Sequence, residues 1–337
     1  MIYGHGDDAF RFKKIKLNFS SNVSPFGVSE SLQKHLALQL SKLDSYPEPL
    51  AQNLARAIGE KKNIPAENIL IVQGATEAFY LLASLFYGKR SLIYTPSFSE
   101  YEDACCMHNH ELEFISNAQF PSSKHAKFDL VWLCNPNNPD GKIFDKTLLV
   151  DEIKRNCRTL FIIDEAYADF INTNISLENE ATQLSNVIII KSLTKRFAIP
   201  ALRLGYMVCS IKLMQQLQAK LMPWRINSLA LEAGMFCLSE SFHDEFKLPD
   251  LLNESKRFQE AINQIKGFSV LPSSSSFFLV KATIIANELK TKLAEKHSIL
   301  IRDASNFRGL TPQHFRLATQ MPHENDELIH ILKSWNQ

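Results

Sequence analysis

The fold is indicated most directly by residues 187–206, Val187-Ile-Ile-Ile-Lys-Ser-Leu-Thr-Lys195-Arg-Phe-Ala-Ile-Pro-Ala-Leu-Arg203-Leu-Gly-Tyr206. The first four residues are apolar and β-branched, which predicts a buried strand over residues 187–190. Lys195 follows shortly after this strand, at the edge where an open α/β sheet builds its binding sites. The stretch therefore predicts an α/β sheet with a functional site at the carboxyl end of this strand.

The polar residues of this stretch suit a phosphorylated aldehyde. A lysine amine that loses its proton forms a Schiff base with a carbonyl group. Arg203 offers a guanidinium fork that can bind phosphate, and Ser192 adds a hydroxyl. Pyridoxal phosphate is a ligand of this chemistry. On these residues alone, an ordinary surface lysine and arginine beside a strand remain the alternative.

The composition is that of a soluble globular protein. With 337 residues, of which 45% are hydrophobic, the chain can bury a large core, and one large plus one small domain is expected. The net charge of +1 gives no basic field for binding nucleic acid. No apolar run fits a signal peptide or approaches the ~18 residues of a membrane span, so we expect a cytoplasmic protein.

The cysteines predict free thiols. They are scattered without CxxC spacing, several in apolar surroundings, which favours buried thiols in a reducing compartment over disulfides or a metal site. They are Cys105, Cys106, Cys134, Cys157, Cys209 and Cys237.

Short apolar runs alternate with helical patterns over the first two thirds of the chain. This alternation predicts a mostly parallel sheet with helices on both faces. The expected strands cover residues 69–72, 91–94, 130–134, 160–163, 187–190 and 204–209. After about residue 240, helices and strands follow in a different order, which predicts a smaller α+β domain. Its expected helices lie near 250–265 and 284–296, and its strands at 277–280, 299–301 and 315–318.

Three loops after these strands carry polar groups with distinct chemistry. Gly74, Ala75 and Thr76 open a helix whose N–H groups could bind an anion, although an ordinary threonine cap explains them too. Asn138 lies on a proline-rich loop that a tight turn would also explain. Asp164 directly follows an apolar strand, where a carboxylate needs either a cationic partner or a structural hydrogen bond.

Together with Lys195, these motifs resemble the fold-type-I pyridoxal-phosphate enzymes, the class I/II aminotransferase superfamily. The similarity runs from about residue 15 to residue 332 and includes Asn135-Pro-x-x-Pro-x-Gly141 and Asp164-Glu-Ala-Tyr167. It implies a large domain with a mostly parallel seven-stranded sheet between helices, plus a smaller α+β domain built from both terminal segments. The implied boundaries are 1–45 for the N-terminal segment that packs with the small domain, 46–238 for the large domain and 239–337 for the small one.

The resemblance also implies roles for individual residues. Lys195 would form the covalent link to pyridoxal 5'-phosphate and then move the substrate proton, while Asp164 would pair with the ring N–H. Asn138 and Tyr167 would bind the ring hydroxyl. The cofactor phosphate would be held by Gly74, Ala75, Thr76, Ser192, Thr194 and Arg203.

Two aromatic residues complete the implied cofactor site. Tyr101 would stack on the ring face, although a core aromatic is the alternative. Tyr46 would reach the cofactor of a neighbouring subunit, which implies a homodimer with shared sites.

The resemblance implies a phosphorylated substrate as well. Arg316 would hold a carboxylate as a bidentate fork. The further candidates for substrate binding are Arg302, Asn22, His5 and Arg225. Within the superfamily, the chain is similar to the branch of histidinol-phosphate aminotransferases and threonine-phosphate decarboxylases. The features include Met222-Pro-Trp224 and Asn306-Phe-Arg-Gly309.

The expected activity is decarboxylation of O-phospho-L-threonine to 1-amino-2-propanol phosphate, a step of cobalamin side-chain biosynthesis. The alternatives are an aminotransferase for histidinol phosphate or another amino acid with 2-oxoglutarate, and a non-catalytic protein that keeps the fold. A Rossmann nucleotide enzyme is disfavoured because no Gly-x-Gly-x-x-Gly follows an early strand.

Some residues depart from the pattern of the superfamily. Val72 and Gln73 replace the usual Gly-Asn before the phosphate loop, and Ala75 replaces a polar residue, which backbone donors should tolerate. Ala201 replaces a glycine, and Asp140 adds a carboxylate near the expected ring site.

Overall fold

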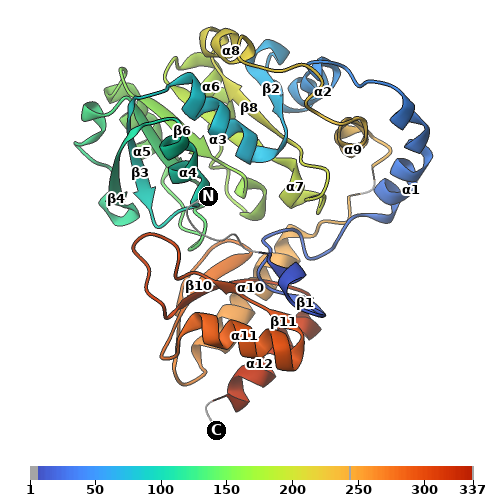
Figure 1. Ribbon diagram of the computed structural model, residues 1–337, viewed down its shortest axis with the longest axis vertical. Helices are drawn as coiled ribbons and strands as arrows, with labels where there is room; N and C mark the ends of the chain where they lie inside the picture. Colours follow the sequence, from blue (N-terminus) through green and yellow to red (C-terminus); the bar gives the residue numbers. More distant parts are fainter. Residues whose placement is uncertain (1–6, 243, 336–337) are drawn as a thin grey trace.

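A seven-stranded sheet forms the centre of the larger of two units in the computed structural model, which describes residues 7–242 and 244–335 (Figure 1). The strand order is β2-β8-β7-β6-β5-β3-β4, and β8 runs in the direction opposite to the other six strands. The strands are β2 (Ile69–Val72), β3 (Arg90–Thr95), β4 (Glu111–Ser116), β5 (Leu130–Cys134), β6 (Leu160–Asp164), β7 (Val187–Ser192) and β8 (Gly205–Cys209). The carboxyl ends of β2, β5, β6 and β7 therefore meet at one edge.

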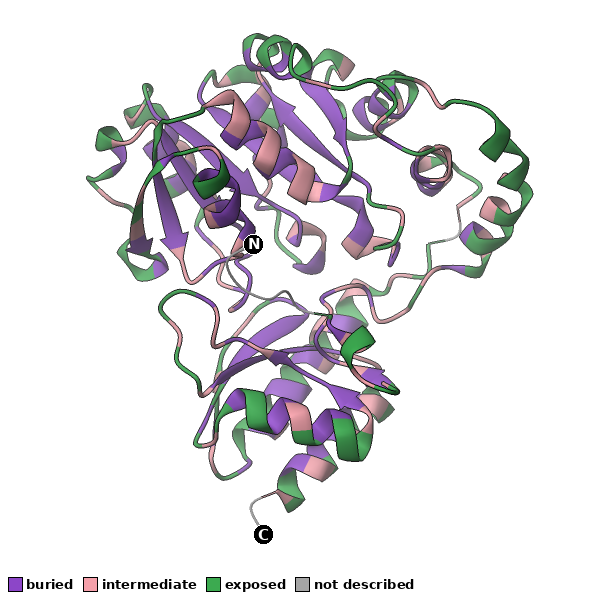
Figure 2. Cartoon of the chain, viewed as in Figure 1, coloured by how far each residue is buried: buried purple, intermediate pink, exposed green. Residues whose placement is uncertain are grey.

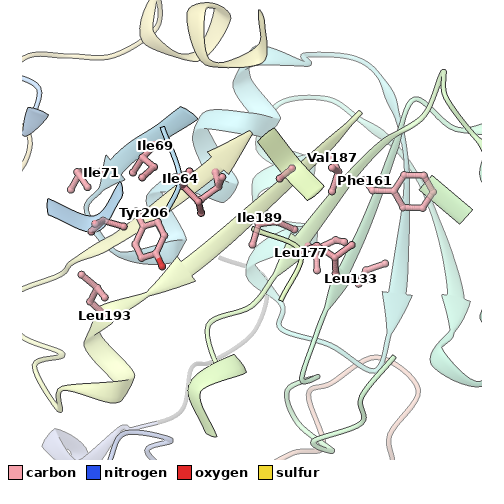
Figure 3. Close-up of a cluster of buried hydrophobic side chains, with 14 of the residues drawn as sticks. Ile64, Ile69, Ile71, Leu133, Phe161, Leu177, Val187, Ile189, Leu193 and Tyr206 are labelled. Carbon is pink, nitrogen blue, oxygen red and sulfur yellow. The ribbon is translucent and has the colours of Figure 1, made fainter. Parts of the chain in front are cut away.

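Helices cover both faces of this sheet, as its continuous apolar strands require. Alternate residues of β6 enter opposite cores: Phe161 and Ile163 face one, Leu160 and Ile162 the other. The first core is closed by α2 (Gln52–Lys62), α5 (Lys146–Arg155), α6 (Glu178–Gln183) and α9 (Ser228–Leu238). The second is closed by α3 (Gly74–Leu85), α4 (Glu100–Met107) and α8 (Ile211–Gln218). Figure 2 shows most of the sheet as buried, and Figure 3 shows part of the first core, with Tyr206 and Ile189 among its side chains.

The smaller unit is an antiparallel sheet packed against helices. Its strands follow the order β12-β13-β10-β9. They are β9 (Phe268–Leu271), β10 (Phe277–Ala282), β12 (Arg302–Asp303) and β13 (His314–Ala318). The helices are α10 (Leu248–Asn263), α11 (Ala286–His297) and α12 (Pro322–Ser334). This unit is the α+β domain that the sequence predicted.

The N-terminal segment divides between the two units. β1 (Leu17–Asn18) pairs in parallel with β11 (Ile299–Leu300), which places this part in the smaller unit, as expected (Figure 1). The next helix, α1 (Glu30–Leu38), instead packs Leu32 against Ala233 and Cys237 of α9 in the larger unit. The expectation that all of residues 1–45 pack with the small domain therefore fails for α1.

The expected strands are all present, and the structure adds the two-residue strands β1 and β12 and the longer strands β4 and β9. Both longer strands carry charged or exposed residues between apolar ones, which weakens their apolar signal. All six cysteines are free thiols, and four of them are buried. Among the residues that the structure describes, no helix is long and apolar enough to span a membrane.

Candidate active site

A cavity of about 510 Å³ lies at the carboxyl edge of the large sheet. It gathers residues from the ends of β6 and β7, from the start of α3 and from the smaller unit. Twelve of the predicted site residues line it: Asn22, Ala75, Thr76, Asn138, Asp164, Tyr167, Ser192, Thr194, Lys195, Arg203, Arg302 and Arg316. The fold thus brings together side chains that are almost 300 residues apart in the sequence.

One corner of the cavity is built for an anion. The N-terminus of α3 presents Ala75 and Thr76, and its free N–H groups carry the positive end of the helix dipole. The Arg203 guanidinium lies beside Gly74, where an added Cβ would meet Nη2 at 2.8 Å. Gly74 also has φ +73°, so only glycine allows both this backbone and this close approach. The hydroxyls of Ser192 and Thr194, 2.6 Å apart, complete the corner.

Lys195 lies on α7 (Leu193–Arg196), the single helical turn after β7. Burial, together with the positive charges of Arg316 and Arg203, lowers the pKa of its amine to about 8. The Nζ atom is 6.0 Å from the centroid of the Tyr167 ring. The lowered pKa makes an uncharged amine, the nucleophilic form, available near neutral pH.

Asp164 ends β6 inside the cavity wall and is almost fully buried. Its Oδ1 accepts a hydrogen bond from the Ala166 N–H at 2.9 Å, and its Oδ2 accepts one from the Tyr101 hydroxyl at 2.6 Å. Burial raises the pKa of the carboxyl, while these two donors and the charge of Lys195 act in the opposite direction. The carboxylate is thus positioned to accept a further donor from the cavity.

Arg316 lies opposite, on β13, and is 5% exposed. Its Nη1 donates to Asn138 Oδ1 at 2.6 Å and its Nη2 donates to the carbonyl of Ser20. Burial lowers its pKa to about 10, so the guanidinium keeps its charge at neutral pH. Within residues 7–242 and 244–335 it forms no ion pair, and its Nε has no hydrogen-bond partner. A buried cation in this state is matched to an anionic ligand.

Asn22 and Arg302 also line the cavity. Neither polar atom of the buried Asn22 amide has a hydrogen-bond partner in the described part of the chain. Arg302 Nη2 donates to Asn306 Oδ1 at 2.9 Å, and Arg302 Nη1 donates to the Asp303 carbonyl at 2.6 Å.

The prediction that Tyr101 stacks on the ring face is wrong. Tyr101 is 1% exposed and lies behind the cavity wall, where its hydroxyl binds Asp164 instead of its ring facing the ligand space. Phe98 lines the cavity in its place. Because α4 begins at Glu100, the side chain of Tyr101 turns into the core between α3 and the sheet. Recognising this helix start would have favoured Phe98.

The prediction that Arg225 binds the substrate is also wrong. Arg225 Nη1 is 2.7 Å from Glu77 Oε2, and its Nη2 donates to the Ile71 carbonyl. The guanidinium therefore ties the loop before α9 to α3 and β2 and does not line the cavity. His5 lies outside the described residues.

Tyr46 lies outside the cavity of its own chain. It is 86% exposed, and its ring centroid is 5.4 Å from that of Trp224. This position leaves it available to another subunit, so its predicted role stays a prediction.

The structure explains what Asp140 does. Its Oδ1 accepts hydrogen bonds from the Asn137 side chain at 2.7 Å and from the Lys142 N–H at 3.1 Å. The carboxylate braces the loop that carries Asn138 and does not line the cavity. Residues that sequence reasoning missed in the lining are Asp7, Ser20, Ser21, Phe79, Phe98, Glu100, Ala166, Pro200 and Phe307. Most of them lie in loops or at a helix start, and Phe79 lies within α3. Ala166 and Phe307 belong to motifs whose other residues carried the predicted roles.

Comparison with known proteins places the chain among enzymes. The sequence model of the family described as aminotransferase class I and II matches residues 14–332. The threonine-phosphate decarboxylase of Salmonella typhimurium is 30% identical over 94% of this chain and 90% of its own length. The L-threonine-O-3-phosphate decarboxylase from Porphyromonas gingivalis has a similar structure, with a TM-score of 0.92, 35% identity, and coverage of 95% of this chain and 99% of that one. The histidinol-phosphate aminotransferase from Clostridium acetobutylicum gives a TM-score of 0.87 and 29% identity, over 95% and 98% of the two chains.

Proposed function

The chain belongs to the aminotransferase class I and II family, and from this membership and its cavity we propose that it decarboxylates O-phospho-L-threonine to 1-amino-2-propanol phosphate. The chain is a pyridoxal-phosphate-dependent enzyme of this family. The proposal concerns the substrate and the bond that breaks.

The residues of the cavity fit the cofactor. The corner of Arg203, Ser192 and the α3 N-terminus would hold its phosphate, Lys195 its aldehyde carbon and Asp164 its ring nitrogen. Asn22, whose buried amide has no hydrogen-bond partner in the described residues, and Tyr167 also line the cavity. When bound, pyridoxal phosphate supplies a ring that withdraws electrons from the bonds at the substrate Cα.

The observation that carries the proposed substrate is the set of arginines. Among the described residues, three arginines line the cavity, and only Arg203 belongs to the corner for the cofactor phosphate. Arg302 and Arg316 remain for the substrate. O-phospho-L-threonine carries a carboxylate and a phosphate, whereas histidinol phosphate lacks the carboxylate. Two further arginines therefore match the two anionic groups of O-phospho-L-threonine.

The chain's own residues have the positions that this reaction needs. Arg316 would hold the carboxylate on the side of Asn138, and Arg302 would hold the substrate phosphate. Lys195, with its lowered pKa, can supply the proton that replaces CO₂ at the Cα. Asp164, Arg302 and Arg316 are buried, which strengthens their interaction with the substrate.

Transamination is the second candidate, and the likeness to a histidinol-phosphate aminotransferase favours it. Both reactions share the cavity and the cofactor. They differ in which bond of the substrate is aligned with the ring, so product analysis separates them.

A single incubation tests the proposal. Holoenzyme is mixed with O-phospho-L-threonine without any 2-oxo acid, and CO₂ and the cofactor spectrum are followed together. We expect catalytic CO₂ release with the aldehyde form of the cofactor retained. Conversion to the amine form without CO₂ would instead identify an aminotransferase, and histidinol phosphate with 2-oxoglutarate would then be the next substrate pair.

We also propose a homodimer formed through the rim of the larger unit. Large apolar side chains are exposed along α1, the turn after it, the loop before α9 and α9 itself. Figure 2 colours much of α1 and of these loops as exposed. These side chains are Leu38, Leu40, Leu43, Tyr46, Met222, Trp224 and Met235. Such a concentration of exposed apolar side chains marks an association surface. Tyr46 lies within it, so a partner bound here could receive the hydroxyl of Tyr46.

Leu43→Asp should convert the dimer to a monomer, because it buries a carboxylate in an apolar interface. Sedimentation equilibrium at micromolar concentration would measure this. The matched control is Leu148→Asp, since Leu148 is 44% exposed on α5 and outside this rim. A monomeric wild-type protein, or a dimer that survives Leu43→Asp, would contradict the proposed interface.

A further inference from the structure

Tyr101 is held rigidly behind the cavity by aromatic rings. Its ring centroid is 4.8 Å from that of Phe79, 6.0 Å from that of Trp132 and 6.1 Å from that of Phe98. The contacts with Phe79 and Phe98 are edge-to-face, and the one with Trp132 is stacked. With 1% of its surface exposed, the phenol has little freedom to leave this position.

The hydroxyl of Tyr101 can act in one direction only. It is 2.6 Å from Asp164 Oδ2, a short distance typical of a hydrogen bond to a carboxylate. Burial and the charge of Asp164 raise the pKa of the Tyr101 hydroxyl well above its usual value. The phenol therefore stays protonated and donates a hydrogen bond to Asp164.

We propose that Tyr101 is a positioning residue for the cofactor, which holds the Asp164 carboxylate in place for the ring nitrogen of pyridoxal phosphate. This inference rests on the assignment of the cavity to that cofactor. It replaces the stacking role that the sequence suggested for Tyr101 by a hydrogen bond to the carboxylate.

The physical reason is the cost of a buried carboxylate. Burial is the largest influence on the pKa of Asp164 and raises it, and the Tyr101 hydrogen bond is the first of the influences that lower it. Without this donor the population of the neutral acid rises and that of the carboxylate falls. A neutral acid is a poorer acceptor for the N–H of a protonated ring. The Ala166 N–H would then hold Oδ1 alone, leaving the carboxyl freer to rotate.

The test compares two ligands on Tyr101→Phe, which removes only the hydroxyl. Cofactor-free wild type and variant are titrated by calorimetry with pyridoxal phosphate and with its 1-deaza analogue, in which a C–H replaces the ring nitrogen. In the wild type, pyridoxal phosphate should bind more tightly than the analogue, because only its nitrogen can meet Asp164. In the variant this preference should fall about tenfold, as expected for a lost hydrogen bond to a charged group, with little change for the analogue.

Tyr206→Phe is the matched control. Tyr206 is equally buried and donates to Glu178 Oε1 at 2.7 Å, but it lies in the other core and does not line the cavity. It should leave the ligand preference unchanged. An unchanged preference in Tyr101→Phe, or an equal loss for both ligands, would overturn the inference. A wild-type protein that binds neither ligand would overturn the cofactor assignment itself, so the two failures are distinct.

Discussion

Replacing Lys195 with alanine should abolish both turnover and the absorbance of the lysine-linked cofactor. Lys195 is the only lysine among the described residues that lines the cavity, so no second amine is in place to take over. Acid–base catalysis by a positioned side chain contributes about 10²–10⁴-fold, and the covalent link to the aldehyde is lost as well. We therefore expect CO₂ release to fall by ~10⁴-fold or more in an assay with O-phospho-L-threonine.

Arg196→Ala is the matched control for this variant. Arg196 is the next residue on α7 and also loses a cationic side chain, but its guanidinium pairs with Asp244 and lies 3.6 Å from the centroid of the Phe246 ring, away from the cavity lining. It should keep the cofactor absorbance and most of the turnover. If Lys195→Ala retained near-normal turnover, the assignment of the whole site would be wrong.

The parts of the site that could be predicted from the sequence lie directly at strand ends. Asp164 is the last residue of β6, and Lys195 lies in the single helical turn after β7. The apolar run of each strand therefore predicts which residue reaches the edge of the sheet. The sheet direction then brings these ends to one edge, whatever lies between them. Local pattern and topology agree at these positions, and the expected residues line the cavity.

The parts that could not be predicted depend on rotation about a helix or on distant partners. Tyr101 and Phe98 are three residues apart, and the start of α4 decides which of them faces the ligand. Arg225 is a plausible phosphate ligand until Glu77, 148 residues away, is seen to bind it. Long-range ion pairs of this kind leave no spacing in the sequence. Asp140, which the sequence placed near the cofactor ring, instead accepts a hydrogen bond from Asn137 within its own loop.

Arg316→Ala should weaken binding of O-phospho-L-threonine by ~2–5 kcal/mol, or about 30-fold to several-thousand-fold. The reason is that a buried guanidinium with no ion-pair partner among the described residues meets a carboxylate with little competition from water. Arg316→Lys should fall between wild type and alanine, because an ammonium keeps the charge but loses the planar fork. Equilibrium binding to the holoenzyme would measure each effect separately from turnover.

The product provides the control that separates Arg316 from Arg302. 1-Amino-2-propanol phosphate keeps the phosphate and the amine but has no carboxylate, so Arg316→Ala should change its affinity by less than about threefold. Arg302→Ala should weaken substrate and product alike, since both carry the phosphate. If Arg316→Ala weakened both ligands equally, Arg316 would act on the phosphate or on the shape of the cavity. The two arginines would then not select a carboxylate together with a phosphate, because only one of the two anionic groups would have a matched cation.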